Sequence, residues 1–262
     1  MEITIIHAIL IGLWTAFCFS GMLFGIYSNR CIVLSFGVGL ILGDMPTALA
    51  CGALSELAYM GFGVGAGGTV PPNPIGPGIF GTMMAITSGG SITPEAALAI
   101  STPIAVAIQF VQTAAYTFRA GAPEGAKKAL MSQNLRRFKI ESNATIWIFA
   151  IVGFGLGFAG AVSMDSLLKL IDFIPLILLN GLTVAGKMLP AIGFAMILSV
   201  MAKKELIPFV LLGYVCASYL GLPVIGIAIV GTIFALIELF HKPAEVCISA
   251  GEHEEGAQDD WI

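Results

Sequence analysis

Charged side chains are scarce in this sequence. Only 11% of its 262 residues are Asp, Glu, Lys or Arg, whereas about 25% are charged in ordinary soluble domains. Hydrophobic residues make up 57% of the chain, and the mean hydropathy is +0.95. A chain with so few charges cannot cover the surface of a soluble domain. The composition therefore indicates an integral membrane protein, and no nucleic-acid partner is expected.

The motifs of common enzymes and metal sites are also missing. The five cysteines form no CxxC or Cys/His cluster, so we expect neither a metal nor a disulfide framework. The glycine-rich stretch GFGVGAGG lacks the Gly-Lys-Ser/Thr ending of a phosphate-binding loop. The sequence contains no nucleophile elbow and no zinc-ligand spacing. An enzyme acting by itself is disfavoured, and no cofactor is expected.

Uncharged stretches predict the membrane-crossing segments. A helix needs about 20 apolar residues to cross a hydrocarbon core of about 30 Å. The stretches long enough for this are 3–29, 57–94, 96–118, 142–164 and 206–237. Shorter ones at 173–186 and 188–202, and the stretch 40–56 that Asp44 interrupts, are tilted spans, half-helices or re-entrant pieces. The first segment lacks a basic start and a small-residue cleavage site, so we expect a retained helix.

The few charges are unevenly distributed along the chain. Six of the 12 basic residues lie in a loop at about 119–141, which the positive-inside rule places in the cytoplasm. The same rule gives Lys203 and Lys204 a second cytoplasmic connection. Residues 243–262 contain acidic residues but no Lys or Arg. We therefore predict a membrane domain at 1–240 and a flexible acidic tail at 241–262.

The two halves of the chain differ in how often glycine and proline interrupt the predicted helices. The N-terminal half holds most of the glycines and prolines that interrupt helices, up to Thr93-Pro94-Glu95, which reads as a helix start that leads to about Phe118. The C-terminal half is more regular. It predicts helices at 146–162, 167–179 and 182–201, and two across 206–240 that separate near Gly221-Leu222-Pro223. The predicted fold is an all-α multi-helix transporter with re-entrant or broken helices in its N-terminal half.

The uncharged run GFGVGAGGTVPPNPIGPGIFG at 61–81 contains four prolines and cannot form one unbroken helix. Non-helical backbone at membrane depth survives only where protein buries it or water lines it. Transporters build substrate sites from such discontinuous helices. An ordinary loop between two spans is the alternative. We favour the broken helix, because the run has no charge and lies close to polar residues that need partners.

Those polar residues are candidates for a binding site. A carboxylate inside a membrane helix costs about 2.5 to 3.5 kcal/mol, which makes Glu56 and Asp44 functional candidates. Asp44 follows Gly43 and fits a helix N-cap equally well. Asn73 can offer amide donors and a carbonyl to a polar ligand, or serve as a turn residue. Gln109 and Gln112 share a helix face and suit hydrogen bonds between helices.

Several segments together resemble a known family. They are MEITIIHAILIGLWTAF, LILGDMPTALACGALSELAYMGFGVGAGGTVPPNPIGPGIFGT, LLNGLTVAGKMLPAIGFAMILSVM and ELIPFVLLGY. Over nearly all of residues 1–240 the chain resembles the membrane subunit IIC of mannose/fructose/sorbose-type phosphotransferase systems. Within that family it looks most like the N-acetylgalactosamine and galactosamine branch.

This resemblance implies a sugar permease in a bacterial cell membrane. It implies a partner membrane subunit IID, cytoplasmic phosphocarriers IIA and IIB, and an assembly of three IIC–IID pairs. In the family, the sugar is phosphorylated as it is delivered inside, so no phosphorylated residue is expected on this chain. A mobile core is expected to carry the sugar in an elevator movement, with re-entrant hairpins around Asp44 to Glu56 and in the 61–81 run.

The resulting site hypothesis combines the residues with the resemblance. Glu56 accepts hydrogen bonds from sugar hydroxyls, and Asp44 either contacts sugar or holds the hairpin. Asn73 and the amides around Gly67, Gly68 and Thr69 complete the lining, with Ser55 and Asn29 as secondary candidates. One rival is a proton- or ion-coupled secondary transporter that uses Glu56 or Asp44. Another is a membrane scaffold with no transport path.

Overall fold

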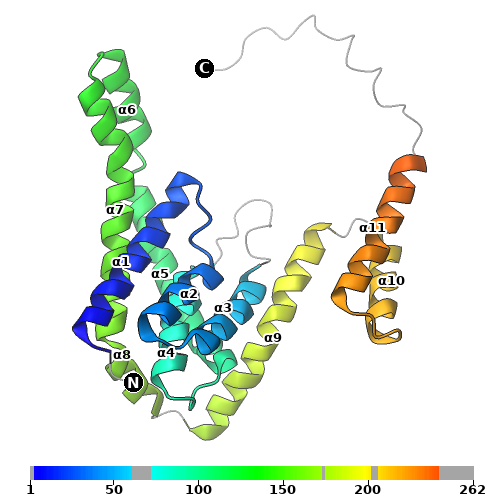
Figure 1. Ribbon diagram of the computed structural model, residues 1–262. Helices are drawn as coiled ribbons and strands as arrows, with labels where there is room; N and C mark the ends of the chain where they lie inside the picture. The colour runs from blue at the N-terminus through cyan, green and yellow to red at the C-terminus, as the bar shows by residue number, and fades with distance from the viewer. Residues whose placement is uncertain (1–2, 61–71, 173–174, 202–205, 242–262) are drawn as a thin grey trace, which may run out of the picture. The chain divides into compact units, whose positions relative to one another are not determined.

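The computed structural model describes residues 3–60, 72–172, 175–201 and 206–241, and every regular element in these ranges is a helix (Figure 1). The chain divides into two compact units, Met1–Val200 and Met201–Ile262. We describe each unit by itself.

Among the described residues, four helices are long and apolar enough to cross a membrane. They begin with α1 (Ile5–Gly21), which a short 3-10 turn η1 (Met22–Phe24) extends. The others are α5 (Pro94–Phe118), α7 (Leu135–Val162) and α9 (Leu176–Met201). The prediction of an all-α integral membrane protein is confirmed, and the chain is a multi-pass membrane protein.

Short helices fill the N-terminal half between α1 and α5. They are α2 (Cys31–Leu42), α3 (Met45–Tyr59), the π-helical η2 (Gly76–Gly81) and α4 (Thr82–Thr87). With 12 residues, α2 is only ~18 Å long and cannot cross a ~30 Å core. A tight turn at Gly43, whose φ is +79°, connects it to α3. The helices of this half are short and interrupted, as predicted, and their re-entrance into the membrane stays a prediction.

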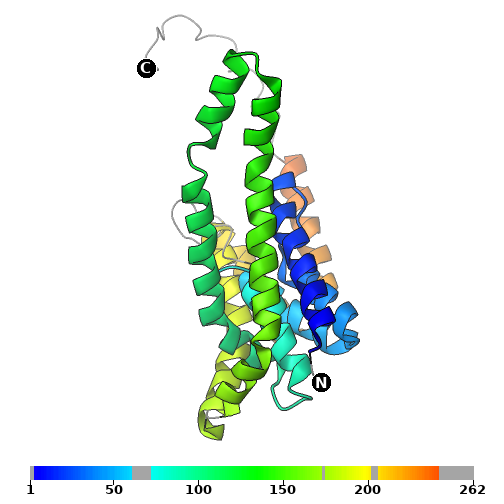
Figure 2. The same cartoon turned by 90° about the vertical axis from the view of Figure 1, so that its left-hand side faces the viewer.

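Close backbone approach holds α1 against α7. The two helices lie side by side in Figure 2, and the Phe19 and Phe149 rings meet at 5.0 Å. A Cβ added to Gly153 would lie 3.0 Å from the Ala16 Cα, and Gly12 faces the Phe154 ring in the same way. Glycine is needed at Gly153 because any side chain there would push the two helices apart.

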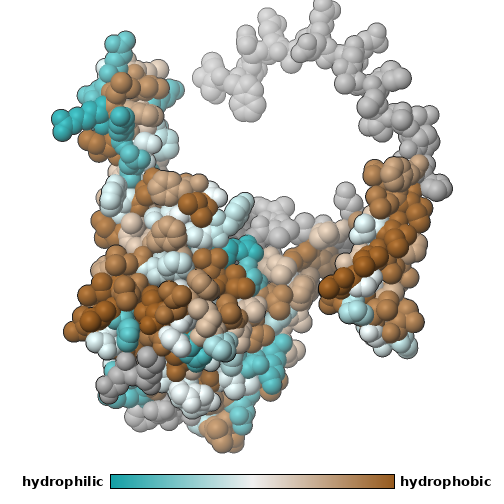
Figure 3. All heavy atoms as spheres, viewed as in Figure 1, coloured by the Kyte–Doolittle hydropathy of each residue, from teal (hydrophilic) through white to brown (hydrophobic). Residues whose placement is uncertain are grey.

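The start of α5 matches its sequence signal. The Thr93 side chain accepts a hydrogen bond from the Ala96 amide, Pro94 is the first helical residue, and the helix ends at Phe118. The basic segment that follows is helical and not an open loop. It forms α6 (Ala122–Met131) and the first turns of α7, a hairpin that carries many hydrophilic side chains (Figure 3). Its cytoplasmic location stays a prediction.

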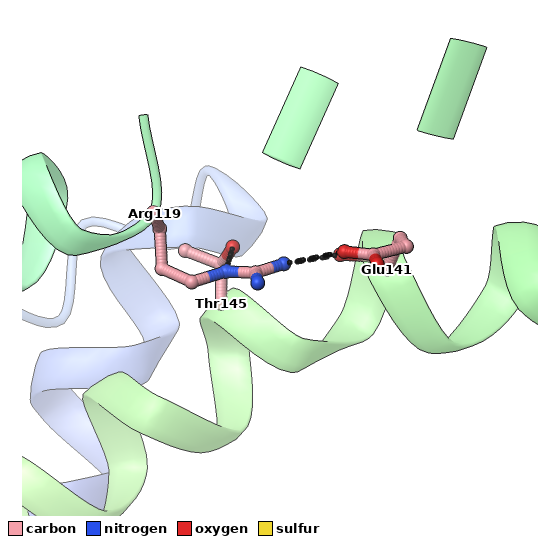
Figure 4. Close-up of polar contacts among 3 residues, drawn as sticks. All are labelled: Arg119, Glu141 and Thr145. Atoms are coloured by element: carbon pink, nitrogen blue, oxygen red, sulfur yellow. Dashed lines mark hydrogen bonds and ion pairs between the residues drawn. The ribbon is translucent and has the colours of Figure 1, made fainter. Parts of the chain in front are cut away.

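Polar contacts fix this hairpin to the end of α5. The Arg119 guanidinium donates to the Glu141 carboxylate at 3.2 Å and to the Thr145 hydroxyl at 3.3 Å (Figure 4). It also donates to the Glu141 carbonyl at 2.9 Å. At the other end of the hairpin, Asn134 caps α7 by accepting from the Arg137 amide. The basic hairpin is therefore a structured extension of α5 and α7.

The C-terminal half differs from the sequence expectation in one place. We expected a break between 179 and 182, but α9 runs without interruption from Leu176 to Met201, after α8 (Met164–Asp172). Asn180 and Gly181 lower helix propensity by amounts that a membrane helix tolerates, because its backbone has no water to bond instead. Gly186 lies against the Glu95 backbone and Gly193 against Leu57 and Ala58, so the part of α9 after the expected break packs against α5 and α3.

In the described part of the second unit, 206–241, lie the helices α10 (Ile207–Ser218) and α11 (Val224–His241). The predicted separation near 221–223 is confirmed, because Gly221 has a φ of +59° and Pro223 directly precedes α11. Two predicted features lie outside the described residues. They are the connection at Lys203 and Lys204, and nearly all of the predicted tail, at 242–262.

The α1–α7 contact yields a stability prediction. Gly153→Leu should destabilise the protein by about 2 kcal/mol or more, because its side chain would meet the Ala16 Cα and the Phe19 Cβ at 3.0 and 3.1 Å from its Cβ. Gly155→Leu on the same helix is the control, since its Cβ would have no neighbour within 4 Å. Thermal unfolding of the purified chain in detergent measures both. Equal stability of the two variants would contradict this packing.

Candidate functional site

The described part of the proline-rich run lies between α2 and α5. The Ser35 hydroxyl of α2 contacts the Gly78 carbonyl at 3.2 Å and accepts a hydrogen bond from the Thr82 hydroxyl at 2.9 Å. The Cys31 thiol lies 3.8 Å from the Pro74 carbonyl. Side chains of α2 therefore contact backbone carbonyls of the interrupted segment, and the Pro74 carbonyl also accepts a hydrogen bond from the Gly78 amide at 2.9 Å. Residues 61–71, which include Gly67, Gly68 and Thr69, lie outside the described residues.

Asn73 forms part of a buried group of amides. Its side chain is completely buried and donates to the Gln112 carbonyl oxygen of α5, while its own side-chain oxygen accepts from the Ile75 amide at 3.0 Å. The Gln112 amide nitrogen lies 4.0 Å from the Met22 sulfur, and the Asn29 amide nitrogen lies 3.6 Å from the same sulfur. We call Asn29, Asn73 and Gln112 the amide cluster.

One atom of the amide cluster has no partner. Among the described residues, the buried Asn29 Oδ1 accepts no hydrogen bond. Leaving a buried carbonyl oxygen unsatisfied costs about 1 to 3 kcal/mol, and such groups in native structures usually have a functional or solvent-mediated explanation. A ligand that donates a hydroxyl or an amide N–H would remove this cost.

Glu56 has a partner that the sequence reasoning missed. Its carboxylate pairs with the Arg30 guanidinium and also accepts a hydrogen bond from the Ile32 amide at 3.4 Å. Its side chain is 19% exposed, so the pair places a mostly enclosed carboxylate at the start of α2, where the helix dipole favours negative charge. Arg30 is the only Lys or Arg in the first 118 residues. A search for a cation to balance Glu56 would have found it.

The N-terminus of α2 joins these features. The three consecutive residues Asn29, Arg30 and Cys31 contact η1, α3 and the Pro74 segment respectively. Of the predicted residues, Asn29 belongs to this short segment and Glu56 pairs with it directly. Asn73 directly precedes Pro74 and bonds to Gln112 and Ile75 instead. Gln112 of α5 accepts a hydrogen bond from Asn73, which lies in the non-helical stretch before η2. The predicted role of Gln112 in hydrogen bonding between helices therefore stays a prediction.

Two other candidates lie elsewhere on α3. Asp44 is its N-cap and accepts a hydrogen bond from the Thr47 amide at 3.2 Å. Twelve residues of helix separate it from Glu56, which is ~18 Å along the axis. In this conformation Asp44 holds the hairpin, which is one of its two expected roles. Ser55 is 1% exposed and lies on the buried face of α3.

Comparison with known proteins identifies the family. The family model described as the sorbose-specific IIC component of the phosphotransferase system matches residues 5–237. The chain therefore belongs to the sorbose-type IIC family of phosphotransferase-system membrane components.

Relatives within the family carry different sugar names. The chain is 32% identical over 180 residues to N-acetylgalactosamine permease IIC component 1 of Escherichia coli K12. That match covers 67% of this chain and 65% of the relative's length. This chain is 28% identical over 206 residues to the mannose-specific EIIC component of the same strain, a match that covers 77% of this chain and 76% of the relative. It is also 28% identical over 214 residues to the sorbose-specific EIIC component of Lacticaseibacillus casei, with 78% and 74% covered.

Solved structures support the same fold. A chain described as a membrane protein superimposes with a TM-score of 0.82 at 25% identity, covering 92% of this chain and 98% of the other. A chain from the complex of the mannose transporter ManYZ with microcin E492 superimposes with a TM-score of 0.57 at 25% identity, covering 93% and 98%.

The ion pair yields a second prediction. Arg30→Gln and Glu56→Gln should each destabilise the protein, because the remaining charge loses its partner at membrane depth. The double variant should be more stable than the sum of the two single effects predicts, by about 1 kcal/mol. This coupling energy is small because Arg30 is half exposed and solvent weakens the ion pair. Thermal unfolding in detergent completes the double-mutant cycle.

Asp44→Asn provides the matched control for that cycle. It also changes a carboxylate on α3, but at the far end of the helix from Arg30. Its effect should add to that of Arg30→Gln without coupling. Coupling of equal size in both cycles would show that the Arg30–Glu56 contact is not the cause.

Proposed function

We propose that this chain is the sugar-translocating membrane subunit of a phosphoenolpyruvate-dependent phosphotransferase system. Membership of the IIC family supports the transport role. The observation that carries the proposal within the structure is the buried, unpartnered Asn29 Oδ1, next to a cluster of amides and close in sequence to the Arg30–Glu56 pair. Such groups suit a neutral ligand with many hydroxyls.

The chemistry of the site favours a hexose or an amino sugar. Each sugar hydroxyl donates and accepts, so amide side chains and a carboxylate can bind it on both sides. An acetamido group adds an N–H donor that matches the open Asn29 Oδ1. The relative named an N-acetylgalactosamine permease supports an N-acetylgalactosamine- or galactosamine-like substrate.

The residues proposed to line the pathway are those of the sequence hypothesis, extended by the structure. Glu56 accepts from sugar hydroxyls, and Asn73 and Asn29 contribute amides, with Ser55, Asp44, Gly68 and Thr69 as further candidates. Gln112 and Arg30 join them. In the described conformation the Asn73 side chain is completely buried and donates to Gln112, so sugar contact there requires this hydrogen bond to exchange.

The proposed system contains further proteins. A IID membrane subunit forms a pair with this chain, and three such pairs make the assembly. Cytoplasmic IIA and IIB carry the phosphoryl group, and IIB phosphorylates the sugar as it is delivered, so this chain carries no phosphorylated residue. The sugar moves with a mobile core in an elevator movement. The family membership supports this arrangement, in which the chain contributes transport and not phosphoryl chemistry.

The rival of a proton- or ion-coupled transporter loses support from the ion pair. Its argument rested on an isolated intramembrane carboxylate, but Arg30 already balances the charge of Glu56, and Asp44 caps a helix. Uptake driven by a pH gradient, without phosphoenolpyruvate or carriers, would overturn the proposed function.

The amide cluster yields the test of function. In membranes that contain the chain with its IID partner, labelled hexoses and amino sugars should enter only when phosphoenolpyruvate and the carriers are present. Asn29→Leu should reduce this uptake and phosphorylation more than tenfold. Removing one uncharged side chain that hydrogen-bonds the substrate weakens substrate binding by about 1.4 kcal/mol or more. Gln112→Leu should act in the same direction.

Gln109→Leu is the control for these variants. Gln109 lies one turn before Gln112 on α5, but it is only partly buried and donates no side-chain hydrogen bond to the amide cluster. Sugar uptake by the Gln109→Leu variant should stay within twofold of uptake by the unaltered protein. Unchanged uptake in folded Asn29→Leu complexes would exclude the amide cluster from the sugar pathway.

A further inference from the structure

One exposed face of α7 changes from basic to aromatic to aliphatic along its length. Residues three or four apart on a helix share a face, and Arg136, Lys139, Asn143, Trp147 and Ile151 follow this spacing. All five side chains are exposed, with Trp147 at 69% and Ile151 at 69%. We call this set the α7 outer face.

A shallow groove lies in the middle of the α7 outer face. Its volume is about 480 Å³, and its lining combines the Lys139 amine, the Asn143 amide and the Trp147 indole with apolar side chains. The complete lining is Lys139, Ile140, Asn143, Ala144, Trp147 and Ile148. A groove of this composition offers a cation and hydrogen-bond donors beside an apolar wall.

The positive charge of this face is not neutralised by its own helix. At 100° per residue, Glu141 and Thr145 lie on the opposite side of α7 from Asn143 and Trp147. Glu141 is already paired with Arg119 there, as Figure 4 shows. Neither Arg136 nor Lys139 forms an ion pair within the described residues. Both cations are therefore open to an external anion.

We propose that the α7 outer face binds the headgroup of an anionic phospholipid. Lys139 and Arg136 pair with the phosphate, and the Asn143 amide donates to the headgroup. The Trp147 indole lies at the boundary between headgroup and hydrocarbon, where aromatic residues gather in membrane proteins. Ile148 and Ile151 follow at the depth of the acyl chain.

The order of residues favours a lipid over an acidic protein. Binding of an acidic protein would not require cation, amide, indole and aliphatic side chains to follow one another in this order along the helix axis. A phospholipid presents its phosphate, its ester region and its acyl chains in that order. Basic pockets on membrane helices bind anionic headgroups for this reason.

The test compares lipids and matched charge variants of the full-length chain in detergent. Native mass spectrometry measures the binding of phosphatidylglycerol and of phosphatidylcholine. The unaltered chain should prefer phosphatidylglycerol. Each cation near a membrane surface contributes about a fivefold effect on anionic lipid binding, so R136Q/K139Q should weaken phosphatidylglycerol binding about 25-fold and leave phosphatidylcholine unchanged.

The control variant K127Q/K128Q removes the same charge from α6, outside the α7 outer face. It should change phosphatidylglycerol binding less than twofold. Equal losses in both double variants would mean diffuse attraction and would overturn the proposal, as would equal binding of both lipids. If R136Q/K139Q keeps its lipid but loses carrier-dependent sugar phosphorylation, the face binds an acidic protein and the proposal is wrong.

A second measurement locates the lipid without relying on charge variants. Brominated phosphatidylglycerol should quench the fluorescence of Trp147 more strongly than brominated phosphatidylcholine. The W147F variant identifies this signal, because Trp14 and Trp261 remain. Equal quenching by both lipids would contradict a headgroup site beside Trp147. Size-exclusion profiles check that each variant is folded.

Discussion

The pairing of open backbone groups inside the membrane is the constraint on which the N-terminal half depends. The prolines at 72–77 prevent a regular helix, and hydrocarbon offers no water to bond the carbonyls left open. Ser35 and Cys31 of α2 lie against the Gly78 and Pro74 carbonyls, while Gly76 and Gly78 let the segment approach α5 and α2 closely. Helices α2 and α5 therefore both pack against the broken helix, and the contact with α5 brings Asn73 next to Gln112.

The sequence predicted the elements whose signals are local. Thr93-Pro94 marks the start of α5, Gly221 and Pro223 separate α10 from α11, and the prolines near Asn73 interrupt the helix. The uninterrupted α9 was missed because Asn180 and Gly181 look like a break in water, whereas a membrane removes the competing solvent. The helical hairpin at 119–141 was missed because its basic residues were used only to predict which side of the membrane it lies on, and not its secondary structure.

The candidate site was predicted in part, and for a physical reason. Composition identifies Glu56 as costly in a membrane, but only the fold brings Arg30 to it from another helix. The unpartnered Asn29 Oδ1 is likewise a property of packing and cannot be read from residue order. Asp44 shows the reverse case. Its preceding glycine and its preference for caps gave the right local role, and the structure places it at the opposite end of α3 from Glu56.

The helix α7 has three faces with different partners, and this division bears on how a sugar could move. Glycines such as Gly153 and Gly157 pack on α1, the side of Glu141 and Thr145 binds the end of α5, and the α7 outer face remains exposed. The residues of the candidate site come instead from α2, α3, η1, α5 and the Pro74 segment. Because α5 contributes Gln112 to the candidate site and its C-cap Arg119 bonds to α7, it is the element that connects the candidate site with the helix that carries the α7 outer face.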